Sequence, residues 1–233
     1  MEIDRRQRIA GLAYTFVKEN SSVRVRSTSS SEFYKFLLLL SLKKSPLRKG
    51  KKYNEVDELF DKVVGEAVKN HFGNGTKILR FGWPPSEKRP HNFKKALDWL
   101  SGETGVRTGN NTGTPKNKDG GVDIVAWKPF LDNRTAFLIA LVQCTVQLDW
   151  FPKAKDIHDM LWLARLDTAR PAILSLAIPF IIETNYDKWD DLRRLVNLVF
   201  DRLRLSEYLA TSDSSSFIKM LRWNRKELPK FVV

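Results

Sequence analysis

Several segments of the chain have apolar residues at helical spacing, with a hydrophobic side chain at every third or fourth position and polar side chains between them. The clearest is 53–72, which Gly73 and Gly75 bring to an end. The same spacing predicts helices over 4–16, 32–42, 92–100, 156–166, 186–210 and 214–228.

Four other segments carry the patterns of β-strands. The stretches 122–130 and 135–146 are joined by the turn LDNR, which predicts an antiparallel hairpin. The continuous apolar run 172–182 is typical of a strand that is buried on both faces, and polar and apolar residues alternate over 22–27. Strands interspersed with helices predict an α/β fold, in which helices pack on both faces of a small mixed sheet.

The chain divides into two parts at a basic stretch that is interrupted by Pro46 and Gly50. This stretch, KKSPLRKGKK, is expected to be a solvated linker. We therefore predict a helical N-terminal extension over 1–50 and a main domain over 51–233. The segment 101–121 is crowded with Gly, Asn and Thr, which predicts a mobile loop in the main domain.

Composition narrows the class of protein. The 233 residues are 42% hydrophobic and 29% charged, which is typical of a globular protein. The longest apolar run, FLLLLSL, is far shorter than the roughly 18 residues of a membrane span, so we expect a cytoplasmic protein without membrane contact. A single cysteine excludes an internal disulfide and a cysteine-based zinc site. The net charge of +13 favours a polyanionic partner, with nucleic acid first among them.

Polar side chains interrupt the predicted hairpin near one end. Asp123 lies in its first strand and Gln143 in its second, and pairing of the strands brings the two side by side. A buried carboxylate at this place requires a partner, and a divalent cation supplies one. Gln143 and Thr145 share one strand face, whereas Cys144 lies on the other and is expected to be a small core residue.

This pattern resembles the PD-(D/E)xK nuclease superfamily, which has a restriction-endonuclease-like fold. In that family a first strand ends in a metal-binding Asp, the next strand carries (D/E/Q)-x-K, and the preceding long helix often contributes an acid. The chain is similar to the subgroup with the pattern DGGxDxxAW, QC and WxxK, which is matched by Asp119, Gly120, Gly121, Asp123, Ala126, Trp127, Gln143, Cys144, Trp150 and Lys153. With RFGWP (80–84) and FDRLRL (200–205), the resemblance covers most of 53–210.

The resemblance implies an endonuclease that hydrolyses the phosphodiester bonds of DNA with Mg²⁺ or Mn²⁺. It implies that the metal is held by Asp123, Gln143 and the backbone carbonyl of Cys144, together with an acid from the long helix. Both Asp61 and Glu66 qualify as that acid, and spacing alone does not separate them. A bacterial or mobile-element setting and a role in defence against foreign DNA are also implied.

The chain departs from the family at Thr145, where the superfamily usually has its lysine. Threonine carries no charge, so the resemblance implies a migrated lysine, with Lys153 as the first candidate and Lys155 as the second. The ammonium would orient the attacking water and stabilise negative charge on the scissile phosphate. The departure also favours an alternative, a non-catalytic DNA-binding or complex-assembly module with the nuclease fold. An RNA substrate, a partner protein that gives specificity and a homodimer are further expectations.

Overall fold

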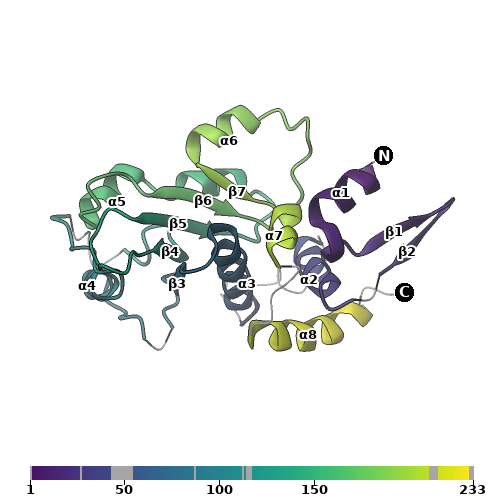
Figure 1. Cartoon of the computed structure of the whole chain (residues 1–233), viewed down its shortest axis with the longest axis horizontal. Helices are drawn as coiled ribbons and strands as arrows, with labels where there is room; N and C mark the ends of the chain where they lie inside the picture. The colour runs from purple at the N-terminus through teal and green to yellow at the C-terminus, as the bar shows by residue number, and fades with distance from the viewer. Residues whose placement is uncertain are drawn as a thin grey trace.

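The computed structural model of the chain describes residues 2–26, 28–42, 55–86, 88–111, 113, 117–209 and 215–230. Its centre is a five-stranded mixed sheet with the strand order β3-β4-β5-β6-β7 (Figure 1). The strands are β3 (Lys77–Arg80), β4 (Ile124–Lys128), β5 (Leu138–Cys144), β6 (Ile173–Ala177) and β7 (Leu198–Phe200). The predicted α/β class with a small mixed sheet is therefore confirmed.

Strand directions bring several chain segments to one edge of this sheet. The strands β3, β4 and β5 form an antiparallel meander, which confirms the predicted hairpin. The chain then passes through a 3₁₀ turn, η3 (Phe151–Lys155), and α5 (Asp159–Arg165) to β6, which runs parallel to β5 as such a crossover allows. A second crossover through α6 (Trp189–Leu195) places β7 parallel to β6. The start of β4 and the ends of β5, β6 and β7 therefore share one edge.

Helices cover both faces of the sheet (Figure 1). On one face lie α4 (Phe93–Thr104), α5 and α6, and on the other lie α3 (Glu55–Phe72) and α7 (Arg202–Leu209). Two further helices, α2 (Ser31–Ser41) and α8 (Ser215–Glu227), pack outside α3 and α7. None of the helices in the described part of the chain is long and apolar enough to cross a membrane.

Side-chain alternation in β4 explains this layering. Ile124 and Ala126 belong to the buried cluster that α3 completes, whereas Val125 and Trp127 belong to the cluster that α4 completes. Both faces of the strand are thus buried, which requires a nearly continuous apolar sequence.

The N-terminal segment contains a small sheet as well as helices. After α1 (Glu2–Ala10) and a 3₁₀ turn, η1 (Gly11–Ala13), the strands β1 (Phe16–Glu19) and β2 (Ser22–Val25) form an antiparallel hairpin. The strand pattern in the sequence around β2 is confirmed, so the extension is not helical throughout. In the described part of the extension, α1 and α2 contact α7, and α2 also contacts α8. The predicted linker and the boundary between residues 50 and 51 lie outside the described residues.

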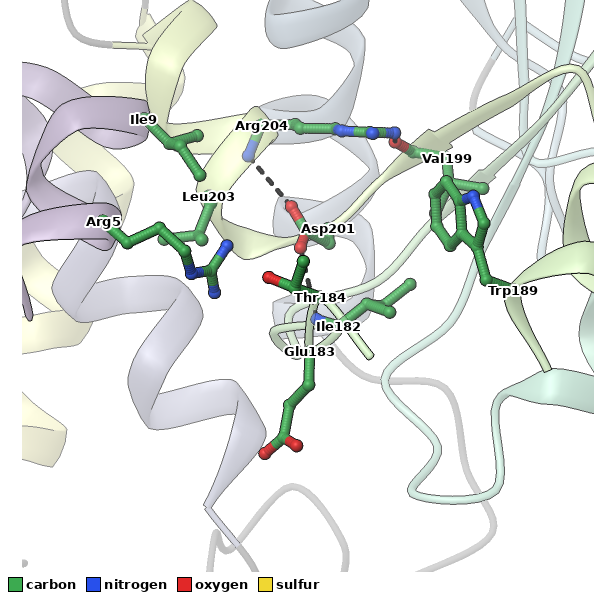
Figure 2. A pocket seen from close by; sticks show the side chains of 10 residues that line it. All are labelled: Arg5, Ile9, Ile182, Glu183, Thr184, Trp189, Val199, Asp201, Leu203 and Arg204. Carbon is green, nitrogen blue, oxygen red and sulfur yellow. Dashed lines mark hydrogen bonds between the residues drawn. The ribbon is translucent and has the colours of Figure 1, made fainter. Parts of the chain in front are cut away.

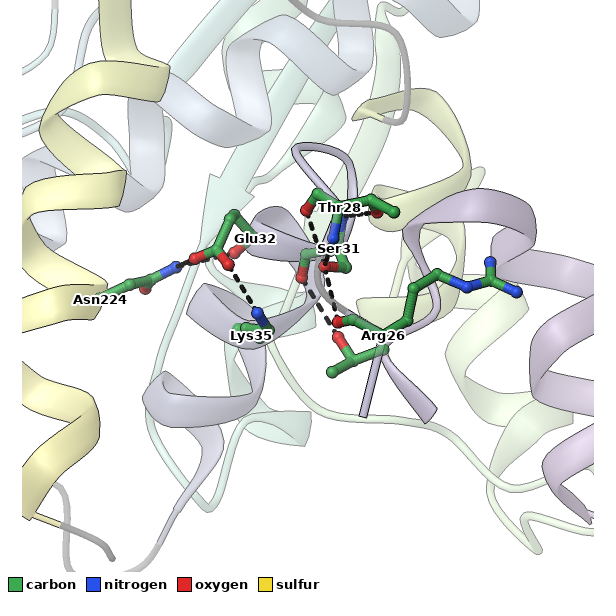
Figure 3. Close-up of polar contacts among 7 residues, drawn as sticks. Arg26, Thr28, Ser31, Glu32, Lys35 and Asn224 are labelled. Carbon is green, nitrogen blue, oxygen red and sulfur yellow. Dashed lines mark hydrogen bonds and ion pairs between the residues drawn. The ribbon is translucent and has the colours of Figure 1, made fainter. Parts of the chain in front are cut away.

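Hydrogen bonds join the start of α2 to α8 (Figure 3). Thr28 and Ser31 cap each other, since each backbone N–H donates to the hydroxyl of the other residue, at 3.0 and 3.2 Å. The carboxylate of Glu32 accepts from Nζ of Lys35 at 2.6 Å and from Nδ2 of Asn224 at 3.0 Å. The N-terminal extension and the C-terminal helix therefore form one packed layer.

The prediction of one helix over 186–210 is wrong. The structure divides this segment into α6, the strand β7 and α7. Asn197 starts the strand, because its Oδ1 accepts from the backbone N–H of Leu174 and its own N–H donates to the carbonyl of Leu174, both at 2.9 Å. The apolar run before Asp201 fits both a helical and an extended period, and pairing with β6 decides for the strand.

Candidate functional site

Polar residues gather at the sheet edge where β4 begins and β5 ends. Asp123 directly precedes β4, and Gln143 and Cys144 are the last residues of β5. The backbone N–H of Asp123 donates to the carbonyl of Val142 at 2.9 Å, which extends the pairing of the two strands to this point. The family resemblance places the Asp at the end of its strand, whereas here it stands at the beginning. Because β4 and β5 are antiparallel, the beginning of β4 lies beside the end of β5, and Asp123 is still next to Gln143.

Asp123 and Gln143 are direct neighbours, as expected from the hairpin. Nε2 of Gln143 donates to Oδ2 of Asp123 at 2.9 Å and to the carbonyl of Cys144 at 3.1 Å. The backbone N–H of Cys144 donates to the same carboxylate oxygen at 2.7 Å. Because the amide nitrogen of Gln143 is occupied in this way, its Oε1 is the atom left to meet a cation.

Of the two acids proposed from α3, Asp61 is the one at the edge. Its carboxylate, the carboxylate of Asp123 and Sγ of Cys144 lie within 4.8 Å of one another. Glu66 follows Asp61 by five residues, which rotates it about 140° around the helix axis. Among the described residues Glu66 does not belong to the cluster. Gly65 confirms the orientation of α3, since a Cβ atom there would lie 3.0 Å from Cγ2 of Ile78 in the sheet.

The cluster contains one more acidic group than its basic group neutralises. Nε of Arg80 lies 2.9 Å from Oδ2 of Asp61, and their side chains are only 11% and 5% exposed. Burial raises the pKa of Asp123 well above its ordinary value, and the charge of Asp61 raises it further. The N–H of Cys144 and the charge of Arg80 oppose this rise without cancelling it. The charged form of Asp123 is therefore only partly compensated by its surroundings.

Cys144 packs against the core on the face opposite Gln143, as expected, and its thiol also lies in this cluster, which the sequence did not predict. The side chain does point to the face opposite Gln143, but α3 carries Asp61 on that face. Burial raises the pKa of the Cys144 thiol well above its usual range, and the charges of Asp61 and Asp123 raise it further. At neutral pH the thiol is protonated and donates a hydrogen bond to Asp61.

This protonated thiol predicts low reactivity. Cys144 is the single cysteine of the chain, so a disulfide reagent such as DTNB reports on it alone. We expect the folded protein at pH 8 to react roughly tenfold or more slowly than free cysteine, because the thiolate is the nucleophile and its population is small. Unfolding in guanidinium chloride should restore the rate of a free thiol. A folded-state rate equal to the unfolded one would contradict the placement of the thiol beside two carboxylates.

The backbone at Gly82 and the carboxylate of Asp119 hold the segment around Asp123 in place. The N–H of Gly82 donates to the carbonyl of Asp123 at 2.9 Å, and a Cβ atom on Gly82 would lie 2.7 Å from Oδ1 of Asp123. Asp119 joins the two segments, because its carboxylate accepts from the N–H of Gly121 at 3.0 Å and from the N–H of Trp83 at 3.1 Å. The matched DGG and RFGWP stretches are therefore parts of one support around Asp123.

Thr145 does not present a free polar group to the cluster. It is 6% exposed, and its hydroxyl accepts a hydrogen bond from the backbone of Gln147 at 3.2 Å. The positive charge beside the acids comes instead from Arg80, which sequence reasoning did not single out. The available signal was its position, since Arg80 ends a strand that pairs with β4 immediately beside Asp123.

The predicted catalytic lysine lies in η3, close to the loop that precedes Asp123. Nζ of Lys153 pairs with Oδ2 of Asp156 at 2.8 Å. The backbone of Asp156 packs against Gly121, because a Cβ atom on Gly121 would lie 2.3 Å from the carbonyl oxygen of Asp156. Lys155, the second candidate, is exposed. The catalytic role of either lysine stays a prediction.

No family model, curated protein or solved structure matches this chain. A functional proposal therefore rests on the geometry of the chain's own residues and on the resemblance in its sequence pattern.

Figure 2 shows a pocket of 260 Å³ that is lined in part by Val199 of β7. Strand register places Gln143 opposite Leu176, and Leu176 opposite Val199, which lines the pocket. Two strand spacings correspond to about 10 Å. Gln143 and Val199 therefore lie on the same face of the sheet.

The walls of this pocket are held by hydrogen bonds (Figure 2). Asp201 accepts from the N–H of Arg204 at 3.0 Å and from the N–H of Ile182 at 3.2 Å, so both its carboxylate oxygens are used. Nη1 of Arg204 donates to the carbonyl of Val199 at 2.8 Å, and its guanidinium lies 5.4 Å from the centre of the Trp189 ring. Asp201 thus caps α7 through backbone contacts instead of pairing with an arginine side chain.

The donor atoms of the cluster match the preferences of a hard divalent cation. Two carboxylates from Asp61 and Asp123, the free amide oxygen of Gln143 and the carbonyl of Cys144 are all oxygen donors, as Mg²⁺ and Mn²⁺ prefer. The protonated thiol does not compete with them, since soft metals bind the thiolate.

Proposed function

We propose that the chain is a Mg²⁺- or Mn²⁺-dependent deoxyribonuclease with a restriction-endonuclease-like core. The observation that carries the proposal is the convergence of Asp61, Asp123 and Cys144 within 4.8 Å. An acid from the long helix, an Asp and a Gln from neighbouring strands are the groups that the PD-(D/E)xK resemblance implies. The buried carboxylate of Asp61 and the half-buried carboxylate of Asp123 lie beside one arginine among the described residues, Arg80, and this excess of negative charge favours the binding of a further cation.

The roles of the side chains follow from their positions. Asp61, Asp123, Oε1 of Gln143 and the carbonyl of Cys144 would hold the metal, which when bound polarises a phosphate oxygen and acidifies a water molecule. Gln143 is neutral, so it contributes less to metal affinity than a carboxylate would. The backbone of Gly82 packs directly against the Asp123 carboxylate and holds it at the sheet edge in the ligand-free protein.

Two cations are candidates to stabilise the charge of the scissile phosphate. Arg80 already lies in the cluster, and its bond to the carbonyl of Pro84 at 2.8 Å fixes its guanidinium there. Lys153 would first have to leave Asp156, an exchange of partners that a phosphate can drive. We propose Lys153 for this role on the basis of the resemblance and Arg80 on the basis of the geometry.

Several wider features stay predictions. DNA as the substrate is supported by the net charge of +13, and RNA has the same backbone charge. The pocket beside Trp189 offers space of 260 Å³ for a base or sugar next to the cleaved phosphate. A cytoplasmic location, a partner protein that gives specificity, a homodimer and a role in defence come from the sequence alone.

A second candidate function is a non-catalytic DNA-binding module with the same fold. It is favoured by the buried, hydrogen-bonded state of Thr145 and by the ion pair that occupies Lys153. Such a module would bind DNA and leave it intact.

Plasmid cleavage separates these functions and also decides between the two helix acids. Supercoiled DNA is incubated with wild type, Asp61→Asn or Glu66→Gln, with and without Mg²⁺. We expect metal-dependent cleavage by the wild type, a rate roughly 100-fold or more lower for Asp61→Asn because a metal ligand is lost, and about the wild-type rate for Glu66→Gln. A parallel RNA substrate tests the choice of nucleic acid.

The controls address folding and the rival function. Removing the charge of Asp61 breaks its ion pair with Arg80, so the double substitution Asp61→Asn/Arg80→Gln and circular dichroism spectra accompany the single variant. Equal losses in Asp61→Asn and Glu66→Gln would contradict the proposed site. A wild type that binds the plasmid but never cuts it would establish the binding module instead.

A further inference from the structure

A groove of 550 Å³ runs between the first turns of α3 and the outer helix α8. In Figure 1, α8 crosses close to one end of α3, on the side away from the sheet. The floor is formed by Val56, Leu59 and Trp223. The walls carry charged side chains, which are Glu55, Glu58, Lys62, Lys219, Arg222 and Lys226.

The α8 wall of this groove is purely cationic. Lys219, Arg222 and Lys226 are three and four residues apart, so they line one face of the helix over about 10 Å. All three side chains are exposed. No hydrogen bond or ion pair joins any of them to another residue in the described ranges, whereas the Lys62 charge on the facing wall is taken up by Glu58. With Glu55 and Glu58 on the facing wall, the groove is lined by four basic and two acidic side chains and has a net positive charge.

One end of the groove lies about one helical turn from the acidic cluster along α3. Glu58 lines the groove and stands one helical turn before Asp61 on α3. A hydrogen bond from Lys62 is the main cause that lowers the pKa of Glu58, and the charges of Arg80 and Lys219 lower it further. Glu58 thus experiences the charges of both Arg80, which pairs with Asp61, and Lys219 of α8.

An aromatic ring lies beside these cations. Trp223 contributes to the groove floor and is held edge-on against Phe36, with ring centres 5.2 Å apart. Cations that follow a phosphate chain, combined with an aromatic surface for a base or sugar, are the features of sites that bind nucleic-acid strands.

We propose that this groove binds the sugar-phosphate backbone of a nucleic-acid strand and directs it toward the acidic cluster. The proposal rests on the proposed function, whose substrate it places on the molecule. A line of cations in a concave groove suits a phosphate chain better than a flat membrane surface, and the chain's charge of +13 adds long-range attraction.

The experiment measures binding of a fluorescein-labelled DNA duplex and of its single strand by anisotropy over a range of salt concentrations, without divalent metal. The test variant is Lys219→Gln/Arg222→Gln/Lys226→Gln. The matched control, Lys69→Gln/Lys94→Gln/Lys95→Gln, removes the same charge from exposed lysines outside the groove. All six side chains are exposed, so both variants should fold.

Each lost phosphate contact lowers the slope of log affinity against log salt by roughly 0.7 to 0.9. We therefore expect the slope of the groove variant to fall by about 2 to 3, with binding roughly ten- to a hundredfold weaker at moderate salt. The control should keep most of the wild-type affinity and slope.

The possible results separate a failure of the groove proposal from a failure of the proposed function. Equal losses in the groove variant and the control would overturn the groove, since only net charge would matter. An equal loss of binding to polyglutamate or to phosphatidylserine vesicles would overturn its assignment to nucleic acid. A wild type that binds neither the DNA duplex nor its single strand at low salt would overturn the proposed function, and the groove proposal with it.

Discussion

Replacing Asp123 by asparagine is expected to abolish cleavage and at the same time to stabilise the metal-free protein. Asparagine keeps an oxygen that accepts from Gln143 and Cys144, so the hydrogen bonds of the edge survive. It removes a carboxylate whose charged form is disfavoured by burial and by Asp61. Exchanges of this kind at functional sites gain about 0.5 to 2 kcal/mol. Thermal unfolding should then shift up by about 2 to 4 °C for each kcal/mol in a chain of this size.

The stabilisation depends on pH with a defined sign. The pKa of Asp123 is raised in the folded state above its ordinary 3.8. Between these two values the folded protein binds more protons than the unfolded one, so the free energy of unfolding of the wild type falls as pH rises. Asp123→Asn lacks this fall. The difference between the melting temperatures of Asp123→Asn and the wild type should therefore increase from acidic to neutral pH.

In the presence of divalent metal the wild type should become more stable than Asp123→Asn. A ligand that binds only the folded state adds about 2.7 kcal/mol when its concentration is 100 times the dissociation constant. Melting curves with increasing Mg²⁺ or Mn²⁺ should therefore shift upward for the wild type and stay unchanged for Asp123→Asn. Equal metal-induced shifts in both proteins, or a metal-free Asp123→Asn that is less stable than the wild type at neutral pH, would contradict the site.

Gly121→Ala should cause the largest loss of stability. Gly121 has a φ of +83°, in the left-handed region, which costs a residue with a Cβ about 1 to 2 kcal/mol. The added Cβ would also lie 2.3 Å from the carbonyl oxygen of Asp156, a backbone atom that cannot turn aside. We expect a loss of about 3 kcal/mol or more, measured by denaturant unfolding. Metal affinity should fall as well, because Asp123 follows two residues later.

Gly102→Ala is the matched control. Gly102 lies in α4, and an added Cβ would meet no atom within 4 Å. Alanine favours a helix over glycine by roughly 0.5 to 1 kcal/mol, so this variant should be slightly more stable than the wild type. Equal free energies of unfolding for Gly121→Ala and Gly102→Ala would contradict the close packing of Gly121 against the backbone of Asp156.

Local sequence patterns predicted the elements whose period is long and unambiguous. The helix α3 and the hairpin of β4 and β5 are confirmed, and the hairpin alone made Asp123 and Gln143 neighbours. The prediction failed where a short apolar run fits two periods, as in the strand that follows Asn197. There the partner strand, not the run itself, decides the conformation.

The chain's own order of residues thus determined the α/β class, its net positive charge and the pair of polar side chains at one end of the hairpin. Only the tertiary structure selected Asp61 over Glu66 as the neighbour of Asp123, added Arg80 and brought the Cys144 thiol beside two carboxylates. These outcomes depend on how α3 is rotated against the sheet and on which strands pair. Such contacts join residues far apart in the chain, and side-chain spacing within one element does not encode them.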